Sequence, residues 1–211
     1  MDAEPIETLS GEIELDLPEF DDPPADPLPL LGQWVERAWE LGVREPLALA
    51  LATASPAGRP SVRTVLLKAV EPALVFAFAG HSRKARELEA NSWAAGTLYW
   101  RETTQQVVVE GPVRRLSEAE SDRLFAERPR IAQAATVASR QGEPLEEPAQ
   151  LRAGAAQLAT GDAELTRPPG WSGYELAPQQ VEFWHGSSDR LHRRLLYVRS
   201  DEGWTSRRLQ P

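Results

Sequence analysis

Hydrophobic side chains recur at three- and four-residue spacing between Leu28 and Leu41, and this pattern stops at Gly42. The period is typical of an amphipathic helix with one face on a core. The hydrophobic segments that follow are shorter and are separated by turn residues. A β-hairpin is predicted where SPAGRP, with its proline and glycine, joins LALALATA (47–54) to SVRTVLLKAV (61–70).

The rest of the chain alternates further strand-like segments with a few helices. Strands are predicted for LVFAFA, WAAGTLYW and QQVVVEGPVRRL, and three or four more for residues 173–209. Ser82 and Ser117 are candidate helix N-caps, and Glu120 completes a capping box with Ser117. Residues 129–170 are rich in alanine and are expected to be partly helical. Many short strands with antiparallel turns predict an α+β fold, a small mixed β-barrel with peripheral helices.

Acidic residues are concentrated at the N-terminus. Residues 1–36 hold 11 Asp and Glu and no Lys or Arg, whereas residues 37–211 hold 21 acidic and 23 basic residues. Six prolines also lie before residue 30. Because such a segment buries too little apolar surface to offset its ordering entropy, we expect residues 1–27 to form a disordered acidic arm and residues 28–211 to form one domain. The near-neutral body argues against a general nucleic-acid binder.

The composition excludes several kinds of chemistry. The sequence has no cysteine, which rules out disulfides and thiolate catalysis. Its histidines, His81, His185 and His192, lack metal-ligand spacing, so no metal site is expected. The N-terminus does not resemble a secretory signal, and the longest apolar run, residues 73–79, is too short for a bilayer. We therefore expect a cytoplasmic protein without a membrane partner, whose chemistry comes from a bound cofactor.

Two groups of cations indicate a phosphate site. The predicted hairpin carries Arg63 and Lys68, and the helix after LVFAFA opens with Ser82, Arg83 and Lys84. Free N–H groups and partial positive charge at a helix N-terminus favour a bound anion, and cations in the first turn oppose the helix dipole unless an anion is present. A solvated first turn is the alternative. Arg63 and Lys68 would lie on opposite faces of a regular strand, so a common ligand requires a bulge or a strand end between them.

A second cationic segment lies near the C-terminus. The run VEFWHGSSDRLHRRLLY (181–197) combines an indole, Trp184, and an imidazole, His192, with Arg190 and Arg194. A solvated basic face and a site for an anionic aromatic ligand both account for it. Taken with the phosphate site, the second interpretation indicates a flat, phosphorylated, electron-accepting ring, and flavin mononucleotide (FMN) fits that description.

Seven short motifs occur in order along the chain: RTVLLK (63–68), SRK (82–84), QV (106–107) followed by EG, RP (128–129), SRQ (139–141), EFW (182–184) and RLH-x-R (190–194). In this arrangement, residues 45–211 resemble the pyridoxamine 5'-phosphate oxidase family of FMN-dependent split-barrel oxidases. Three further stretches, LYWRETTQQ, SRQGEPLEE and EGWTSRRLQP, resemble the phenazine-biosynthesis oxidases of that family more closely.

The resemblance implies an FMN-binding split β-barrel that forms a homodimer, with FMN at the subunit interface and four contacts from the partner chain: Gln141, Gly142, Trp184 and Arg194. The cofactor-binding positions expected from the motifs are Arg63, Thr64, Val65, Leu66, Leu67, Lys68, Ala77, Phe78, Ser82, Arg83, Lys84, Gln106, Gln141, Gly142, Trp184 and Arg194. The substrate-binding positions are Lys68, Leu124, Arg128, Ala132, Arg190 and His192. His192 and Arg190 are placed near the flavin, without an assigned catalytic residue.

The sequence departs from the family pattern at the substrate. Leu124 and Ala132 stand where pyridoxamine-phosphate oxidases carry a Tyr and a Ser that grip the substrate phosphate. An unpaired phosphate oxygen costs about 1–3 kcal/mol in a closed site, so a vitamin phosphate is expected to be a poor substrate. The resemblance favours an oxidase of partly reduced phenazine carboxylates that passes electrons to O2 and releases H2O2. The alternatives are a pyridoxamine 5'-phosphate oxidase and a non-catalytic flavin- or haem-binding protein.

Overall fold

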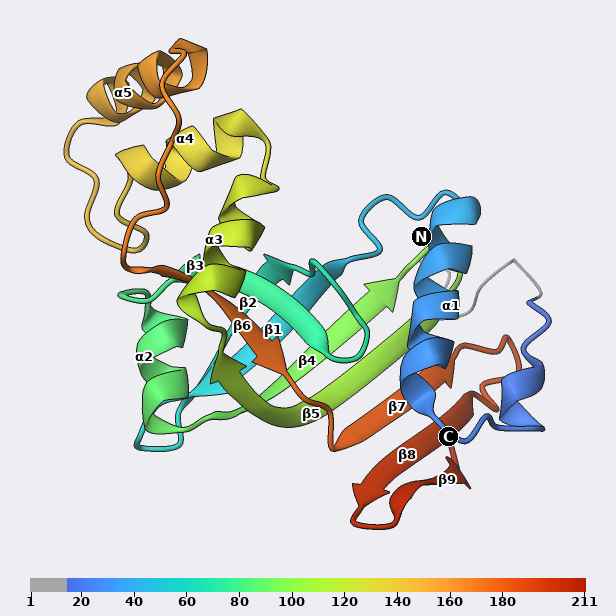
Figure 1. The fold of residues 1–211 in the computed structure, drawn as a ribbon. Coiled ribbons are helices and arrows are strands. Elements are labelled where there is room, and N and C mark those ends of the chain that lie inside the picture. Colours follow the sequence, from blue (N-terminus) through green and yellow to red (C-terminus); the bar gives the residue numbers. More distant parts are fainter. Residues whose placement is uncertain (1–14) are drawn as a thin grey trace, which may run out of the picture.

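The computed structural model describes residues 15–211, which form nine β-strands, five α-helices and one short 3-10 helix (Figure 1). In chain order the elements are η1 Pro18–Phe20, α1 Pro27–Glu40, β1 Ala48–Ala54, β2 Pro60–Leu66, β3 Leu74–Ala79, α2 Arg83–Ala90, β4 Trp93–Trp100, β5 Gln105–Arg115, α3 Glu118–Ala126, α4 Arg130–Ala138, α5 Pro148–Thr160, β6 Trp171–Leu176, β7 Gln180–His185, β8 Arg193–Ser200 and β9 Gly203–Leu209. The α+β class predicted from the sequence is confirmed.

All strand pairs are antiparallel, and six of the strands form a barrel. Its order is β2-β1-β4-β5-β6-β3. The segment after β2 closes the ring onto β3, because the Lys68 amide donates to Val75 O at 2.7 Å and the Val75 amide donates to Ala69 O at 2.9 Å. Strands β7, β8 and β9 extend as a flange from residues 105–110 of β5 (Figure 1). The result is the expected split barrel.

The split occurs where β5 changes partners. Residues 105–110 of β5 pair with β7, whereas Val113 to Arg115 pair with β6. Gly111 stands between the two segments, and a Cβ atom there would lie 2.2 Å from Ala177 O. Only glycine permits this approach of two backbones. Pro112, which has no N–H to donate, accepts a hydrogen bond from the Ala177 amide at 3.0 Å.

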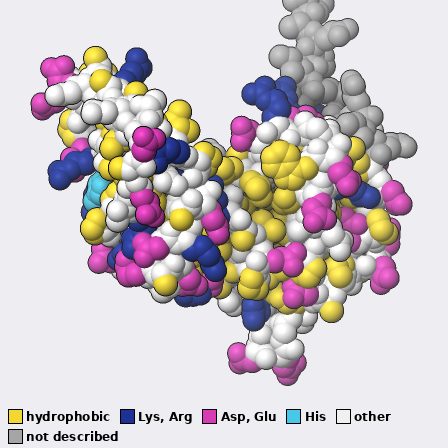
Figure 2. Space-filling model, turned by 45° about the horizontal axis from the view of Figure 1, so that its top comes forward, with side chains coloured by type: hydrophobic (Ala, Val, Ile, Leu, Met, Phe, Trp, Pro, Cys, Tyr) yellow, Lys and Arg dark blue, Asp and Glu magenta, His cyan; other side chains and the backbone are white. Residues whose placement is uncertain are grey.

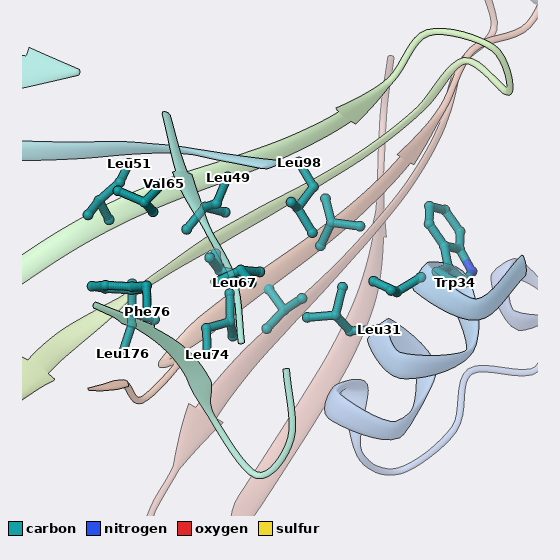
Figure 3. Close-up of a cluster of buried hydrophobic side chains, with 14 of the residues drawn as sticks. Leu31, Trp34, Leu49, Leu51, Val65, Leu67, Leu74, Phe76, Leu98 and Leu176 are labelled. Atoms are coloured by element: carbon teal, nitrogen blue, oxygen red, sulfur yellow. The ribbon is translucent and has the colours of Figure 1, made fainter. Parts of the chain in front are cut away.

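One continuous hydrophobic core fills the barrel and extends under α1. Figure 3 shows Leu49, Leu51 and Leu98 from the barrel wall converging with Leu31 and Trp34 from α1. The Trp34 ring lies 4.9 Å from the ring of Phe183 on β7, in an edge-on arrangement. Helix α1 therefore covers the junction between barrel and flange.

Helices α3, α4 and α5 project from the barrel beside β6 (Figure 1). The capping box predicted at Ser117 and Glu120 is confirmed, with both reciprocal hydrogen bonds present. Helix α5 has no buried residue. It is held to α4 by Arg130, whose guanidinium donates to four carbonyl oxygens at and beyond the end of α5: Leu158 O, Ala159 O, Gly161 O and Ala163 O.

The N-terminal segment differs from the expectation in its described part. Residues 1–14 of the predicted arm lie outside the described residues, but Leu17 and Phe20 are buried in the core. Arg193 holds this segment on β8 through Leu17 O and the Asp21 carboxylate, both at 3.1 Å. The average composition of this segment is polar and predicted disorder. The two apolar side chains of Leu17 and Phe20 are nevertheless enough to attach it to the core. Within residues 15–211, no helix is long and apolar enough to cross a membrane.

Candidate functional site

Helix α2 begins directly after β3, and its first turn holds two buried polar groups without partners. Ser82 is the N-cap residue and is 3% exposed, yet its hydroxyl makes no capping hydrogen bond and no other. Lys84 is 7% exposed, and among residues 15–211 it has neither a hydrogen bond nor an ion pair. Its ammonium lies over the Phe78 ring, 4.7 Å from the centroid. Burying a charge without a counter-ion is costly, and an anion bound at this turn would remove that cost.

The surroundings of Lys84 support this conclusion. Burial, followed by the nearby positive charge of Arg63, lowers the pKa of Lys84. Both effects disfavour the ammonium in the isolated chain, and the negative charge of a bound phosphate would offset them. The predicted residues Arg63, Ser82, Arg83 and Lys84 therefore lie around one turn of helix.

A buried carboxylate, Glu87, organises the two arginines of this cluster. It accepts hydrogen bonds from Thr53 Oγ1 (2.5 Å) and Ser61 Oγ (2.6 Å). It also pairs with Arg83 Nε at 2.7 Å and Arg63 Nη2 at 3.4 Å. Although burial alone raises the pKa of Glu87, these hydrogen bonds and the charge of Arg83 lower it to about 2. Glu87 is therefore ionised at neutral pH and ties α2 to β1 and β2.

Strand β2 ends between Arg63 and Lys68. If the strand continued through both residues, their side chains would lie on opposite faces of the sheet. Arg63 is on the inner face, paired with buried Leu51, whereas Lys68 lies two residues beyond the last strand residue, Leu66. The strand end needed for both to reach one ligand is therefore present. Among the other residues of this motif, Val65 and Leu67 are buried in the core, so only their backbones could contact a ligand.

The predicted flange residues form one row across three strands. Gln106 pairs with Trp184, and Trp184 pairs with Arg194, so the three side chains lie on the same outer face. Arg194 is already bound to Glu182, with Nε and Nη2 at 2.7 and 3.0 Å from the carboxylate oxygens. The side chain of Trp184 is the aromatic surface of this row.

His192 lies beside Trp184, with ring centroids 5.0 Å apart. Its Nδ1 accepts a hydrogen bond from the Ser187 amide at 3.0 Å, so a neutral imidazole carries its proton on Nε2. The turn before it is fixed by Asp189, which accepts from Ser187 Oγ (2.5 Å) and the Leu191 amide (2.8 Å). Arg190, in this turn, has a positive φ of 65°.

The predicted substrate residues on the helical side lie in two hollows. Lys68 and Leu124 line a hollow of about 300 Å³, and Arg128 lines a separate hollow of about 250 Å³ with Ala77, Phe78 and Gln141. Arg128 is half-buried, has no ion pair within residues 15–211, and stacks on Trp171 (5.1 Å) and Phe125 (5.9 Å). Ala132 lies in α4, and Gly142 lies in the following loop.

Gln141 lies beside the end of β3. Its Oε1 accepts a hydrogen bond from the Ala79 amide of its own chain at 3.2 Å. It therefore lies in the same cavity as Ala77 and Phe78.

Sequence reasoning missed Glu87, Thr53 and Ser61, which hold Arg63, and Thr136 and Trp171, which hold Arg128. Only Glu87 left a signal, because it stands four residues after Arg83 on a predicted helix. The other contacts join residues whose proximity depends on the tertiary fold.

We call Arg63, Ser82, Arg83 and Lys84 the phosphate cluster, for the ligand that they would suit, and Gln106, Trp184 and Arg194 the flange row. Within one chain, these two groups do not surround a common space. Arg63 points to the inner face of β2, while Gln106 and Trp184 are on the outer face of β5 and β7, beyond the intervening strands β1 and β4. The outer face also carries exposed apolar side chains, Val62 (69% exposed), Leu66 and Tyr99. Figure 2 shows hydrophobic side chains on the surface between the helical projection and the body.

The described residues fit a phosphorylated flavin. A buried ammonium and a buried hydroxyl without hydrogen-bond partners suit the phosphate, and the half-buried side chains of Trp184 and Gln106 suit a ring. These residues would hold the two ends of such a molecule.

Comparison with known proteins agrees with this chemistry. Residues 35–185 match the family described as pyridoxamine 5'-phosphate oxidase, and residues 171–211 match the pyridoxine 5'-phosphate oxidase C-terminal dimerisation region. The chain is 44% identical to dihydrophenazinedicarboxylate synthase of Pseudomonas chlororaphis over 97% of this chain and 93% of the relative. It is 48% identical to pyridoxine/pyridoxamine 5'-phosphate oxidase of Rubrobacter xylanophilus over 88% of this chain and 87% of the relative.

A solved structure is similar over the same length. The crystal structure of PhzG from Burkholderia lata 383 in complex with tetrahydrophenazine-1-carboxylic acid superposes with a TM-score of 0.91 at 44% identity, covering 95% of this chain and 100% of that chain. With the family match over residues 35–185, the split barrel and the phosphate cluster at α2, the chain belongs to the pyridoxamine 5'-phosphate oxidase family of flavin-dependent oxidoreductases.

Proposed function

We propose that this protein is an FMN-dependent oxidase that removes hydrogen from a partly reduced phenazine carboxylate or dicarboxylate, with O2 as the final acceptor and H2O2 as the released product. The observation that carries the substrate class is Arg128. Its guanidinium is stacked on aromatic rings and has no carboxylate partner within residues 15–211, so a carboxylate ligand would complete it. The similarity to dihydrophenazinedicarboxylate synthase over nearly the whole chain supports the same class.

Two apolar side chains, on α3 and α4, favour a ring system over a vitamin phosphate. Leu124 and Ala132 offer no hydroxyl to phosphate oxygens. A tricyclic ring can instead bury apolar area against them, at about 25 cal/mol per Å².

The cofactor is proposed to be FMN because the described part of the chain offers one compact group of residues for a phosphate and no second one for a diphosphate. Ser82 and Lys84 would bind the phosphate, and Glu87 would hold Arg63 and Arg83 beside it. Bound FMN supplies the hydride acceptor and the reaction of the reduced cofactor with oxygen. The residues of this chain bind and orient the reactants, and His192 offers a proton donor, Nε2–H, beside the Trp184 ring.

The assembly is proposed to be a homodimer with the flavin between subunits. The phosphate cluster and the row of Gln106, Trp184 and Arg194 lie on opposite faces of one chain. Two copies that pair through the outer face would bring one group from each chain to the same molecule. The match of residues 171–211 to a dimerisation region supports this arrangement.

The experiment is an anaerobic half-reaction followed by oxygen. The purified protein should be yellow and should release FMN, not FAD, on denaturation. A partly reduced phenazine carboxylate should bleach the flavin absorbance without O2, and admitting O2 should restore the colour and yield H2O2. A protein that stays colourless with added FMN, or a flavin that the phenazine does not reduce, would refute the proposal.

A second candidate, pyridoxamine 5'-phosphate oxidase, is favoured by the 48% identity to the Rubrobacter relative and by the retained Lys68, Arg128 and His192. Efficient reduction of the flavin by pyridoxamine 5'-phosphate would support it.

A further inference from the structure

The guanidinium of Arg128 is fixed by a residue that the family resemblance does not assign. Arg128 Nη1 donates a hydrogen bond to Thr136 Oγ1 at 2.6 Å. Arg128 follows the end of α3, and Thr136 lies on α4, so this bond crosses the turn between the two helices. Both residues line the cavity of about 250 Å³ that also contains Gln141 and Trp171.

The direction of the hydrogen bonds limits what Thr136 can do. Its hydroxyl donates to Ala132 O at 3.0 Å, one helical turn earlier, so its proton is already used when the oxygen accepts from Arg128. A hydroxyl in this state has no proton for a substrate phosphate. It can orient the guanidinium.

Three contacts then determine the plane of the Arg128 guanidinium: the hydrogen bond to Thr136 and the rings of Trp171 and Phe125. One Nη1–H bond is used, while no hydrogen bond of Nε or Nη2 occurs within residues 15–211. Two parallel N–H groups on one edge of a fixed guanidinium match the two oxygens of a planar carboxylate.

We propose that Thr136 is a positioning residue for substrate choice: it holds Arg128 so that the free edge of the guanidinium receives a ring carboxylate. This proposal rests on the proposed function, because it assumes that Arg128 meets the substrate. It also gives a reason why the chain needs no hydroxyl at Ala132. The hydroxyl of Thr136, one helical turn later, binds Arg128 instead of the ligand.

The test uses a charged ligand and its neutral counterpart. Calorimetric titration of the FMN-loaded enzyme with phenazine-1-carboxylate and with phenazine-1-carboxamide separates the contribution of the carboxylate from that of the ring. Thr136→Val has nearly the same shape without the hydroxyl, and Thr136→Ser restores the hydroxyl. The melting temperature of each variant reports whether the helix pair is intact.

The wild type should bind the acid more tightly than the amide. Thr136→Val should weaken acid binding about tenfold and amide binding less than twofold, and Thr136→Ser should recover most of the acid affinity. Equal weakening of both ligands, or no weakening of either, would overturn the role of Thr136 while leaving the proposed function intact. A wild type without preference for the acid would overturn the proposed substrate class and, with it, this inference.

Discussion

Lys84 combines a charge, deep burial and the lack of a counter-ion in one side chain. It is 7% exposed, its ammonium lies over the Phe78 ring, and the nearest charge that acts on it within residues 15–211 is the positive charge of Arg63. A protein that keeps such a group bears an energetic cost in the isolated chain. A bound phosphate would remove the cost, so this residue supports the proposed cofactor site more strongly than the exposed Arg83 does.

Replacing Lys84 tests that assignment. Lys84→Ala should weaken FMN binding about tenfold to a hundredfold, because one charge-assisted contact to the phosphate is lost. Fluorescence titration of the flavin-free protein measures the dissociation constant. Arg86→Ala, at an exposed position of the same helix, is the control and should bind FMN like the wild type. Equal affinities for wild type and Lys84→Ala would place the phosphate elsewhere.

The sequence predicted this group of residues but not its internal contacts. Ser82, Arg83 and Lys84 could be assigned to a helix start because an N-cap residue follows a strand pattern. Nothing local indicated that Thr53 and Ser61 donate to Glu87, since those bonds join residues 26 to 34 positions apart. The hydroxyl of Ser82 was also expected to cap the helix, and in the structure it makes no such bond.

A single carboxylate, Glu87, adds hydrogen bonds between helix α2 and the barrel to the packing of the buried Ala85 and Leu88 side chains. Glu87 binds groups from β1, β2 and the first turn of α2 itself. The pKa of Glu87 is about 2 in the folded chain, below its ordinary value of 4.5. A lowered pKa means that the ionised form stabilises the fold above about pH 4.5, and that this stabilisation is lost as the pH falls toward 2.

Glu87→Gln should therefore be destabilised in a pH-dependent way. At pH 7 the free energy of unfolding should fall by about 1–3 kcal/mol, because a neutral amide replaces a carboxylate with several charged and hydroxyl donors. Between pH 5 and pH 3 the gap between variant and wild type should narrow. Urea unfolding of wild type and variant at pH 5 and at pH 3 measures this gap in unfolding free energy, with exposed Glu89→Gln as the control. A gap that is the same at both pH values would show that Glu87 does not act through its charge.

Helix α5 depends on one arginine. It has no buried residue, and Arg130 donates to carbonyl oxygens at its C-terminal end. Arg130→Ala should speed amide hydrogen exchange in residues 148–160 by roughly tenfold, because about 1.5 kcal/mol of local stability is lost, while exchange in β4 and β5 stays unchanged. Mass spectrometry resolves the two regions. Faster exchange throughout the barrel would mean that the projection contributes to global stability.

The hydrophobic pattern predicted where most strands lie along the chain. It did not predict how the strands pair with one another. The strand LVFAFA is β3 residue for residue, and the hairpin before it is β1 and β2, although β2 ends at Leu66 and not at Val70. The change of partner within β5 could not be predicted, because it depends on the close approach of Ala177 to Gly111 in three dimensions. The docking of Leu17 and Phe20 was missed for the same reason.

In a single chain, the outer face of the sheet leaves apolar side chains exposed to solvent. Val62, Leu66 and Tyr99 expose apolar surface on the outer face, next to the row that contains Gln106 and Trp184. Large exposed apolar patches are typical of interfaces. The proposed dimer would cover this face and complete the flavin site.

Val62→Asp should prevent assembly. A carboxylate buried in an apolar interface costs several kcal/mol, so the dimer should dissociate at least about a hundredfold more readily and lose FMN with it. Light scattering combined with flavin absorbance follows both properties. Leu145→Asp, on the exposed loop before α5, is the matched control and should remain a flavin-loaded dimer. A Val62→Asp monomer that keeps one FMN would contradict the interface site.

The substrate assignment is the central claim, and a comparison of two substrates tests it most directly. The measurement is kcat/KM in air for a partly reduced phenazine carboxylate and for pyridoxamine 5'-phosphate with the same enzyme preparation. The two missing hydroxyls, at Leu124 and Ala132, should each cost the vitamin phosphate about 1–3 kcal/mol, which predicts a preference of roughly thirtyfold or more for the phenazine. Leu124→Tyr combined with Ala132→Ser should shift the ratio back toward the vitamin. Efficient turnover of pyridoxamine 5'-phosphate by the unaltered enzyme, with no oxidation of the reduced phenazine, would contradict the account.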